Sequence, residues 1–183
     1  MRVQGGNARG RRLSGSIGPN VRPTTARVKK SIFDSLYTVV DLHGAVIADL
    51  FAGTGALGFE AASRGASSVV FVESNLQTAK SLSKSIASLN SNDLECEFKV
   101  VTSDSLTYLK RSPLAQFDLA FVDPPYVFEG WADLFEALNA KIVVAESNRE
   151  LSHATKYERI KFKKFGDTYV SFFKQQLDEE ADR

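Results

Sequence analysis

The residues with the clearest chemical meaning are Asp123, Pro124, Pro125 and Tyr126, which follow the apolar run 117–122. Prolines fix φ and donate no backbone hydrogen bond, so this segment is stiff and its carbonyl groups stay available as acceptors. A carboxylate, free carbonyls and an aromatic ring together suit a planar amine, such as the amino group of a nucleobase. The alternative is a plain turn after a strand, because prolines are common in turns.

A glycine-rich loop lies upstream of this tetrad. The apolar run 46–51 leads into Gly53 and Gly55, and Gly58 completes the pattern G-x-G-x-x-G. In a doubly wound sheet such a loop binds a nucleotide-like cofactor. The next apolar run ends in Glu73, 20 residues past the first glycine, where an acidic residue typically holds ribose hydroxyls.

Asp49 distinguishes between two classes of cofactor. The glycine pattern alone also fits a nicotinamide dinucleotide, but a carboxylate just before the loop would repel a pyrophosphate. The same carboxylate would attract S-adenosylmethionine, whose methionyl end carries an ammonium and a sulfonium. This cofactor has no phosphate, so glycine here permits close approach of the backbone. We therefore expect a methyl donor.

Alternating strands and helices indicate a parallel sheet. Asp49, Glu73, Asp104 and Asp123 each stand at or just after the carboxyl end of an expected strand, so we expect one shared cleft. Asp104 could accept a hydrogen bond from the adenine amino group or cap a helix, and both roles can hold together. The cofactor contacts that we expect are Asp49, Phe51, Ala52, Gly53, Thr54, Gly55, Glu73, Ser74, Asp104 and Ser105.

The expected elements follow hydrophobic periodicity and turn residues. Strands are expected at 45–51, 68–73, 97–101, 117–122 and 141–146, followed by a hairpin of 157–163 and 168–174. Helices are expected at 24–40, 56–64, 75–89, 104–110 and 131–138. The expected units are a basic arm with a hairpin (1–22), a catalytic domain (23–177) and an acidic tail (178–183).

Basic residues concentrate at the amino terminus. Residues 1–30 hold eight of the 23 basic side chains and no acidic one. The rest of the chain therefore has 15 basic and 22 acidic side chains. The alternative is a solvated, flexible terminus without a binding role. Arginines interleaved with glycine, however, suit a polyanion such as nucleic acid. We expect the first helix to expose Arg27, Lys29 and Lys30. The expected RNA contacts are Arg9, Arg11, Arg12, Arg22, Thr24 and Arg27.

Bulk composition limits the possible classes of protein. With 183 residues, 43% of them hydrophobic, the chain can bury one core. Cys96 is the only cysteine, so no internal disulfide forms, and no run approaches the roughly 18 apolar residues of a membrane helix. His43 and His153 lack metal-ligand spacing, so no metal is required. We expect a cytoplasmic protein.

The chain resembles the bacterial 16S ribosomal RNA guanine-N2 methyltransferase family, which modifies guanine 966. The resemblance covers nearly the whole chain and rests on several segments, with departures at 29–31 and Asp34. The matching segments are Gly5-Gly6, 9–13, 22–24, Arg27-Val28, 49–58, Glu60-Ala61, 63–66, 71–73 and 123–126.

The resemblance implies a Rossmann-like class I methyltransferase of α/β class. Its sheet is mostly parallel and seven-stranded, with helices on both faces, a C-terminal antiparallel hairpin and a small N-terminal β-hairpin arm. It also implies S-adenosylmethionine as cofactor, 16S RNA or the small ribosomal subunit as partner, and a monomer. Asp123, Pro124 and Tyr126 would be catalytic, with the first two holding the amino hydrogens of guanine while Tyr126 stacks.

Rival hypotheses stay open because many amino-methyltransferases share the tetrad. One is methylation of adenine or cytosine in DNA, although no target-recognition domain is visible in these 183 residues. Another is methylation of a protein glutamine, which the basic arm disfavours. A third is a non-catalytic RNA-binding assembly factor, for which a damaged glycine loop or tetrad would be expected.

Overall fold

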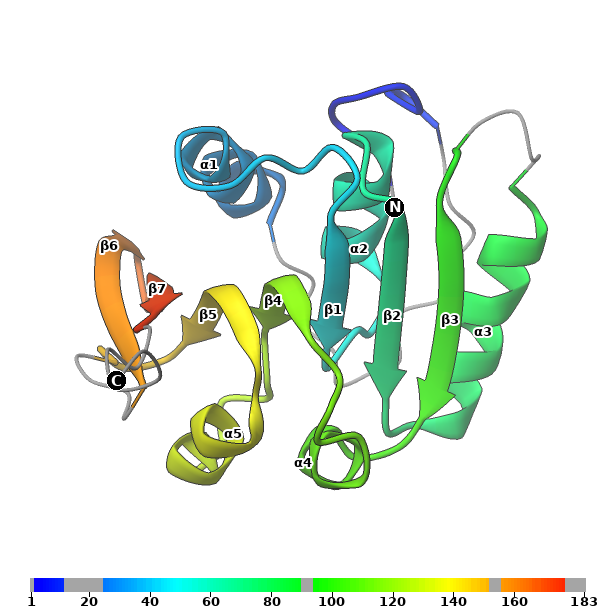
Figure 1. Cartoon of the computed structure of the whole chain (residues 1–183). Helices are drawn as coiled ribbons and strands as arrows, with labels where there is room; N and C mark the ends of the chain where they lie inside the picture. The colour runs from blue at the N-terminus through cyan, green and yellow to red at the C-terminus, as the bar shows by residue number, and fades with distance from the viewer. Residues whose placement is uncertain (1, 12–24, 90–93, 152–155, 177–183) are drawn as a thin grey trace, which may run out of the picture.

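Seven strands form one sheet in the order β3-β2-β1-β4-β5-β7-β6 (Figure 1). The computed structural model describes residues 2–11, 25–89, 94–151 and 156–176. Neighbouring strands from β3 through β5 pair in parallel, and β7 runs antiparallel to both β5 and β6. The strands are β1 Val46–Leu50, β2 Ser68–Glu73, β3 Glu97–Thr102, β4 Phe117–Val122, β5 Ala140–Ser147, β6 Tyr157–Phe165 and β7 Thr168–Gln175.

Helices cover both faces of the sheet, which confirms the predicted α/β class (Figure 1). On one face lie α1 Ala26–Leu36, α2 Ala56–Ser63 and α3 Leu76–Ala87, and on the other lie α4 Ser105–Arg111 and α5 Trp131–Ala137. The central strands are apolar on both sides because each face packs against helices. No described helix is long and apolar enough to cross a membrane.

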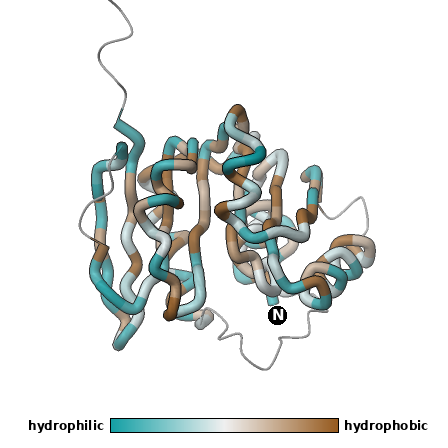
Figure 2. Tube along the Cα trace, turned by 90° about the horizontal axis from the view of Figure 1, so that it is seen from below, coloured by the Kyte–Doolittle hydropathy of each residue, from teal (hydrophilic) through white to brown (hydrophobic). Residues whose placement is uncertain are grey.

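Alternate residues of one strand supply the two hydrophobic cores. Leu119 and Phe121 of β4 face α1 and α2, whereas Ala120 and Val122 face α5. This period of two follows from the pleat of a strand. Figure 2 shows the result as brown segments inside the molecule and teal along the outermost strand at its left edge, β6. The cores hold the carboxyl ends of β1, β2, β4 and β5 in fixed register.

Helix α1 is shorter than the predicted 24–40. It begins after Thr25, whose Oγ1 accepts a hydrogen bond from the backbone N–H of Val28 at 3.3 Å. At the other end, Thr38 and Val39 donate to carbonyls three residues back, at 3.3 and 2.8 Å. This tighter turn ends the helix, and Tyr37 projects into solvent with 90% of its surface exposed.

The prediction that Lys29 is exposed was wrong. Its side chain is buried, with Nζ 3.0 Å from Glu60 Oε2 and donating to the carbonyl of Arg2 at 3.1 Å. Glu60 lies on the buried face of α2, where an ionised carboxylate needs a cationic partner. Lys29 supplies that partner, and a charge pattern on α1 alone cannot reveal it. Arg27 and Lys30 are exposed as predicted.

Gly58 allows α2 to lie close to β2. A Cβ added there would stand 2.3 Å from Phe71 Cε1 and 2.8 Å from Val69 Cγ1. We expect Gly58→Ala to lower the free energy of unfolding by roughly 1–3 kcal/mol through overpacking, measured by urea denaturation. Phe71→Leu in the same chain should recover part of the loss. Equal stability of Gly58→Ala and the unsubstituted protein would contradict this packing argument.

Candidate active site

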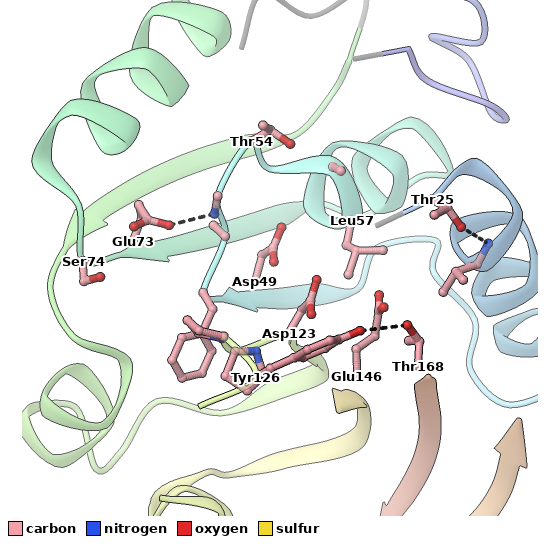
Figure 3. Close-up of a pocket in the computed structure, with 17 residues that line it drawn as sticks. Thr25, Asp49, Thr54, Leu57, Glu73, Ser74, Asp123, Tyr126, Glu146 and Thr168 are labelled. Atoms are coloured by element: carbon pink, nitrogen blue, oxygen red, sulfur yellow. Dashed lines mark hydrogen bonds between the residues drawn. The ribbon is translucent and has the colours of Figure 1, made fainter. Parts of the chain in front are cut away.

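One cavity of about 360 Å³ opens at the carboxyl ends of the parallel strands (Figure 3). Its volume is within the range of small-molecule sites. Residues at or just after the carboxyl ends of β1, β2, β4 and β5 form its walls, together with the beginning of α1, α2 and β7. The predicted residues that line it are Asp49, Phe51, Ala52, Gly53, Thr54, Glu73, Ser74, Asp123, Pro124 and Tyr126.

The glycine loop follows β1 through a sharp change of backbone direction. Gly53 and Gly55 have φ of 53° and 74°, in the left-handed region that favours glycine. Phe51 has φ of 63° and is the one non-glycine residue with positive φ in the described part of the chain. Such a conformation is costly for a bulky side chain and is concentrated at functional sites. Phe51 packs edge-on against Phe128 at 5.2 Å between ring centroids.

Asp49 is buried on the floor of the cavity, where its Oδ2 accepts a hydrogen bond from the Gly58 amide at 2.8 Å. Burial raises the pKa of Asp49 to about 8, and the charges of Asp123 and Glu73 contribute in the same direction. Without a cation beside it, the Asp49 carboxyl therefore favours its protonated form near neutral pH. A cation beside it would favour the ionised form, as S-adenosylmethionine requires.

Glu73 links the glycine loop to the start of α3. Its Oε2 accepts from the Gly53 amide at 2.8 Å and its Oε1 accepts from the Asn75 amide at 2.7 Å (Figure 3). The side chain is half-buried and lines the cavity. Each carboxylate oxygen can accept more than one hydrogen bond, so Glu73 can hold the loop and still bind ribose hydroxyls.

The tetrad forms the opposite wall of the cavity. Asp123 follows β4 directly, and Pro124 is buried beside it. The Tyr126 hydroxyl lies 3.1 Å from Thr168 Oγ1, and the Tyr126 carbonyl accepts a hydrogen bond from Asn148 Nδ2 at 3.1 Å. These two contacts hold the Tyr126 hydroxyl and backbone in place, and 40% of the residue's surface is exposed.

Sequence reasoning missed several wall residues. Glu146 is buried near the end of β5, beside Asp123, which follows β4. Both side chains point into the cavity in Figure 3. The rule that selected Asp49 and Asp123, an acid at the end of an apolar strand, would also have found Glu146. Thr25, Val28 and Thr168 had no such signal because tertiary packing brings α1 and β7 to the cavity.

Three predicted cofactor contacts do not line this cavity. Asp104 caps α4, its Oδ1 accepting from the Thr107 amide at 2.9 Å, which confirms the capping role. Ser105 is buried beneath it. Gly55 is buried where an added Cβ would lie 2.7 Å from Leu82, so this glycine serves packing. The adenine contact of Asp104 stays a prediction.

The predicted arm is placed only in part. Its described residues 2–11 form a loop closed by hydrogen bonds between Val3 and both Gly10 and Arg11. The loop docks on α2, where the Gln4 and Gly5 amides donate to Glu60 at 2.9 and 2.8 Å. Contacts to Ser63 lie farther along α2, away from the residues that line the cavity.

The structure therefore does not bring the first arm arginines to the cavity. Arg9 is exposed and Arg11 half-buried on the docked loop, beside the carboxyl-terminal half of α2. Arg27 is exposed in the first turn of α1, two residues after the wall residue Thr25. The remaining expected RNA contacts, Arg12, Arg22 and Thr24, lie outside the described residues.

Residues 1–174 match the family described as conserved hypothetical protein 95. The chain belongs to this family. Ribosomal RNA small subunit methyltransferase D of Haemophilus influenzae is 38% identical over 130 residues, which are 70% of this chain and 65% of that protein. The Escherichia coli protein of the same name is 36% identical over 126 residues, 69% of this chain and 60% of that protein.

A solved structure agrees with this assignment. It is YhhF of Escherichia coli, described as a candidate methyltransferase, with 28% identity and a TM-score of 0.80. The match covers 97% of this chain and 99% of that one. This chain spans 60% to 65% of the length of the two curated relatives. The class I methyltransferase fold of the family is therefore shown.

Proposed function

We propose that this protein transfers a methyl group from S-adenosylmethionine to the N2 amine of a guanine in 16S ribosomal RNA, guanine 966 by resemblance. The acceptor would be the small subunit or an assembly intermediate. One observation carries the proposal: a single cavity holds both the glycine loop with its carboxylates and the amine-binding tetrad. The names of the curated relatives, which are ribosomal RNA small subunit methyltransferases, support the choice of acceptor.

The cofactor half of the cavity fits the donor in charge and shape. S-adenosylmethionine would supply an electrophilic methyl group on a positively charged sulfur. Asp49 would meet the cationic end, Glu73 the ribose hydroxyls, and the Gly53 backbone would allow close approach. Buried carboxyls with raised pKa values are costly in an empty site, and a cationic ligand gives Asp49 a function that offsets this cost.

The acceptor half fits an extruded base. A guanine in RNA must leave its stack to reach the cavity, which costs a few kcal/mol, and stacking on Tyr126 would return roughly 1–3 kcal/mol. The carboxylate of Asp123 and the carbonyl of Pro124 would then accept hydrogen bonds from the two N2 hydrogens.

Orientation of the amine is the main catalytic task. The lone pair on guanine N2 is delocalised into the ring, so this nitrogen is a poor nucleophile. Hydrogen bonds to Asp123 and Pro124 favour a pyramidal nitrogen whose lone pair points at the methyl carbon. As the N–C bond forms, the S–C electron pair stays on sulfur, and positive charge develops on N2 next to the Asp123 carboxylate. Loss of one N2 proton, to Asp123 or to water, completes the transfer.

The acceptor class can be tested directly. Purified protein and labelled S-adenosylmethionine would be incubated separately with small subunits, deproteinised 16S RNA, DNA, and a protein extract free of ribosomes. We expect label in the small-subunit RNA, and initial labelling slowed at least about 100-fold with Asp123→Ala. Label found only in DNA, or only in protein, would show that this molecule is the acceptor instead of RNA. No label anywhere, with the cofactor still bound, would support a non-catalytic assembly factor instead.

Tyr126 variants separate stacking from positioning. Tyr126→Ala removes the ring, and we expect kcat/KM for RNA to fall roughly 5- to 150-fold, because base stacking is worth about 1–3 kcal/mol. Tyr126→Phe keeps the ring and loses the hydroxyl with its contact to Thr168, so its loss of activity should be smaller. Thr168→Val is the matched control and should resemble Tyr126→Phe. Kinetics of Tyr126→Ala equal to those of the unsubstituted protein would refute stacking.

A further inference from the structure

The hairpin of β6 and β7 is rich in basic side chains that have no role in the proposed chemistry. β6 is the edge strand of the sheet, and residues 156–165 contain five basic side chains and one acidic, Glu158. Lys163 is engaged with α1, its Nζ donating to Ser31 Oγ at 2.8 Å. The other basic residues are Lys156, Arg159, Lys161 and Lys164.

One face of this hairpin combines cations with aromatic rings. The β6–β7 register places Lys164 opposite Tyr169 and Phe162 opposite Ser171, on the face that bears Phe173 and α5. The rings of Phe162 and Tyr169 lie 5.9 Å apart. The Arg159 guanidinium stands 4.9 Å from the centre of the Phe162 ring, and Lys164 Nζ stands 4.8 Å from the centre of the Tyr169 ring.

The tip of this hairpin lies at the edge of the cavity, and the face with the two rings is on the other side of β7 from the cavity residue Thr168. Thr168, the first residue of β7, lines the cavity and contacts the Tyr126 hydroxyl, and Tyr169 is the next residue in the chain. Tyr169 also pairs with Ser147, which follows the wall residue Glu146 on β5. A strand of nucleic acid leaving the acceptor half of the cavity would therefore pass the hairpin tip and reach the two rings.

We propose that the face formed by Arg159, Phe162, Lys164 and Tyr169 binds single-stranded RNA that flanks the target guanine. This inference rests on the proposed function. Aromatic rings with interleaved cations are the usual platform for single-stranded nucleic acid, because bases stack on the rings and phosphates pair with the cations. The hairpin would hold RNA near the acceptor end of the cavity, whereas the docked loop 2–11 lies along α2.

The charge distribution favours RNA over a protein partner. Beyond residue 30 the chain has more acidic than basic side chains, so a basic edge strand stands out from its surroundings. Two acids adjoin the face: Glu150 pairs with Arg159 at 2.7 Å, and Asp167 lies in the hairpin tip beside Lys164. On this face Lys164 is the lysine that would meet a phosphate, whereas Lys161, opposite Phe172, is on the α1 side of the sheet. The competing explanation is that lysines merely protect an edge strand from aggregation.

The test measures RNA affinity and its dependence on salt. The probe is a small-subunit RNA fragment that contains the methylated position and its single-stranded flanks. Lys164→Gln should weaken binding and reduce the slope of log Kd against log salt by about 0.7, the contribution of one lost phosphate contact to a single strand. Phe162→Ala should weaken binding roughly 5- to 150-fold with an unchanged slope.

A matched control removes one exposed lysine elsewhere, with Lys99→Gln on the opposite edge strand β3. We expect RNA affinity, salt slope and thermal stability close to those of the unsubstituted protein. Equal effects of Lys164→Gln and Lys99→Gln would overturn the inference and leave edge protection as the role of the hairpin lysines. If the unsubstituted protein methylates no RNA, the proposed function itself fails. If the protein methylates RNA and no hairpin variant changes this activity, RNA binding by the hairpin is refuted while the proposed function stands.

Discussion

Replacing Asp123 by alanine should lower kcat for methyl transfer by roughly 10²- to 10³-fold, the loss found when one preorganised polar group at a reacting centre is removed. Asp123 sits at the end of β4 between the cofactor half and the acceptor half of the cavity. Its carboxylate would orient the amine and stabilise the charge that develops on N2. Single-turnover kinetics with saturating cofactor would measure this step separately from binding.

Asp123→Asn is the matched control for this effect. Asparagine keeps one carbonyl oxygen that can accept a hydrogen bond from the amine, but it carries no charge. We therefore expect activity between those of the unsubstituted protein and Asp123→Ala, with cofactor affinity little changed in both variants. If Asp123→Ala retained full turnover, the tetrad would not be the amine-binding element.

Binding of S-adenosylmethionine should strengthen as the pH rises toward 8. In the empty site the pKa of Asp49 is about 8, mainly because the carboxyl is buried, whereas a cationic ligand favours the ionised form. Affinity should therefore rise by up to tenfold per pH unit below 8 and then level off, and binding near pH 7 should release a proton. Calorimetry in buffers of different ionisation enthalpy measures both quantities.

Asp49→Asn is the control for this pH dependence. It keeps an oxygen that can accept from the Gly58 amide but cannot ionise, so the slope should vanish. Cofactor affinity should fall roughly 10- to 150-fold, because a hydrogen bond to a charged group is worth about 1.5–3 kcal/mol. A slope that persists in Asp49→Asn would show that another group titrates.

The raised pKa of Asp49 also makes the stability of the cofactor-free protein depend on pH. The folded pKa of Asp49 lies above its ordinary value of 3.8, so its contribution to stability is fully present below about pH 4. That contribution is lost as the pH rises to 8. The cofactor-free protein should therefore lose stability over this range, and Asp49→Asn should lose less. A melting series from pH 5 to 9 compares them.

Much of the fold was predictable because the pattern is local. Each parallel strand is an apolar run that ends in an acid or a turn, and buried helices follow at short distances. The antiparallel hairpin was predicted from the turn residues Gly166-Asp167, whereas the strand order β3-β2-β1-β4-β5 was not predicted, because alternation alone does not determine which strands are neighbours. Helix ends were less predictable: α1 stops at Leu36, where the chain tightens into a narrower turn, although Val39 and Val40 continue the apolar stripe.

The candidate site was predictable where it is built from strand ends. Asp49, Glu73 and Asp123 each follow an apolar run, so their convergence follows from the geometry of a parallel sheet. Thr25 and Thr168 were not predictable, because they reach the cavity through packing of α1 and the turn of an antiparallel hairpin. Burial of Lys29 was missed for the same reason, since Glu60 lies 31 residues away on another helix.

The most direct measurement is the methylation state of one nucleotide in cells. Small-subunit RNA would be purified from cells that lack this protein, before and after incubation of their subunits with the purified chain and S-adenosylmethionine, then digested and analysed by mass spectrometry. We predict N2-methylguanine at a single position, absent before incubation, restored by the unsubstituted protein and not by Asp123→Ala. An unchanged guanine at every position, with cofactor bound and the protein folded, would contradict the proposed function.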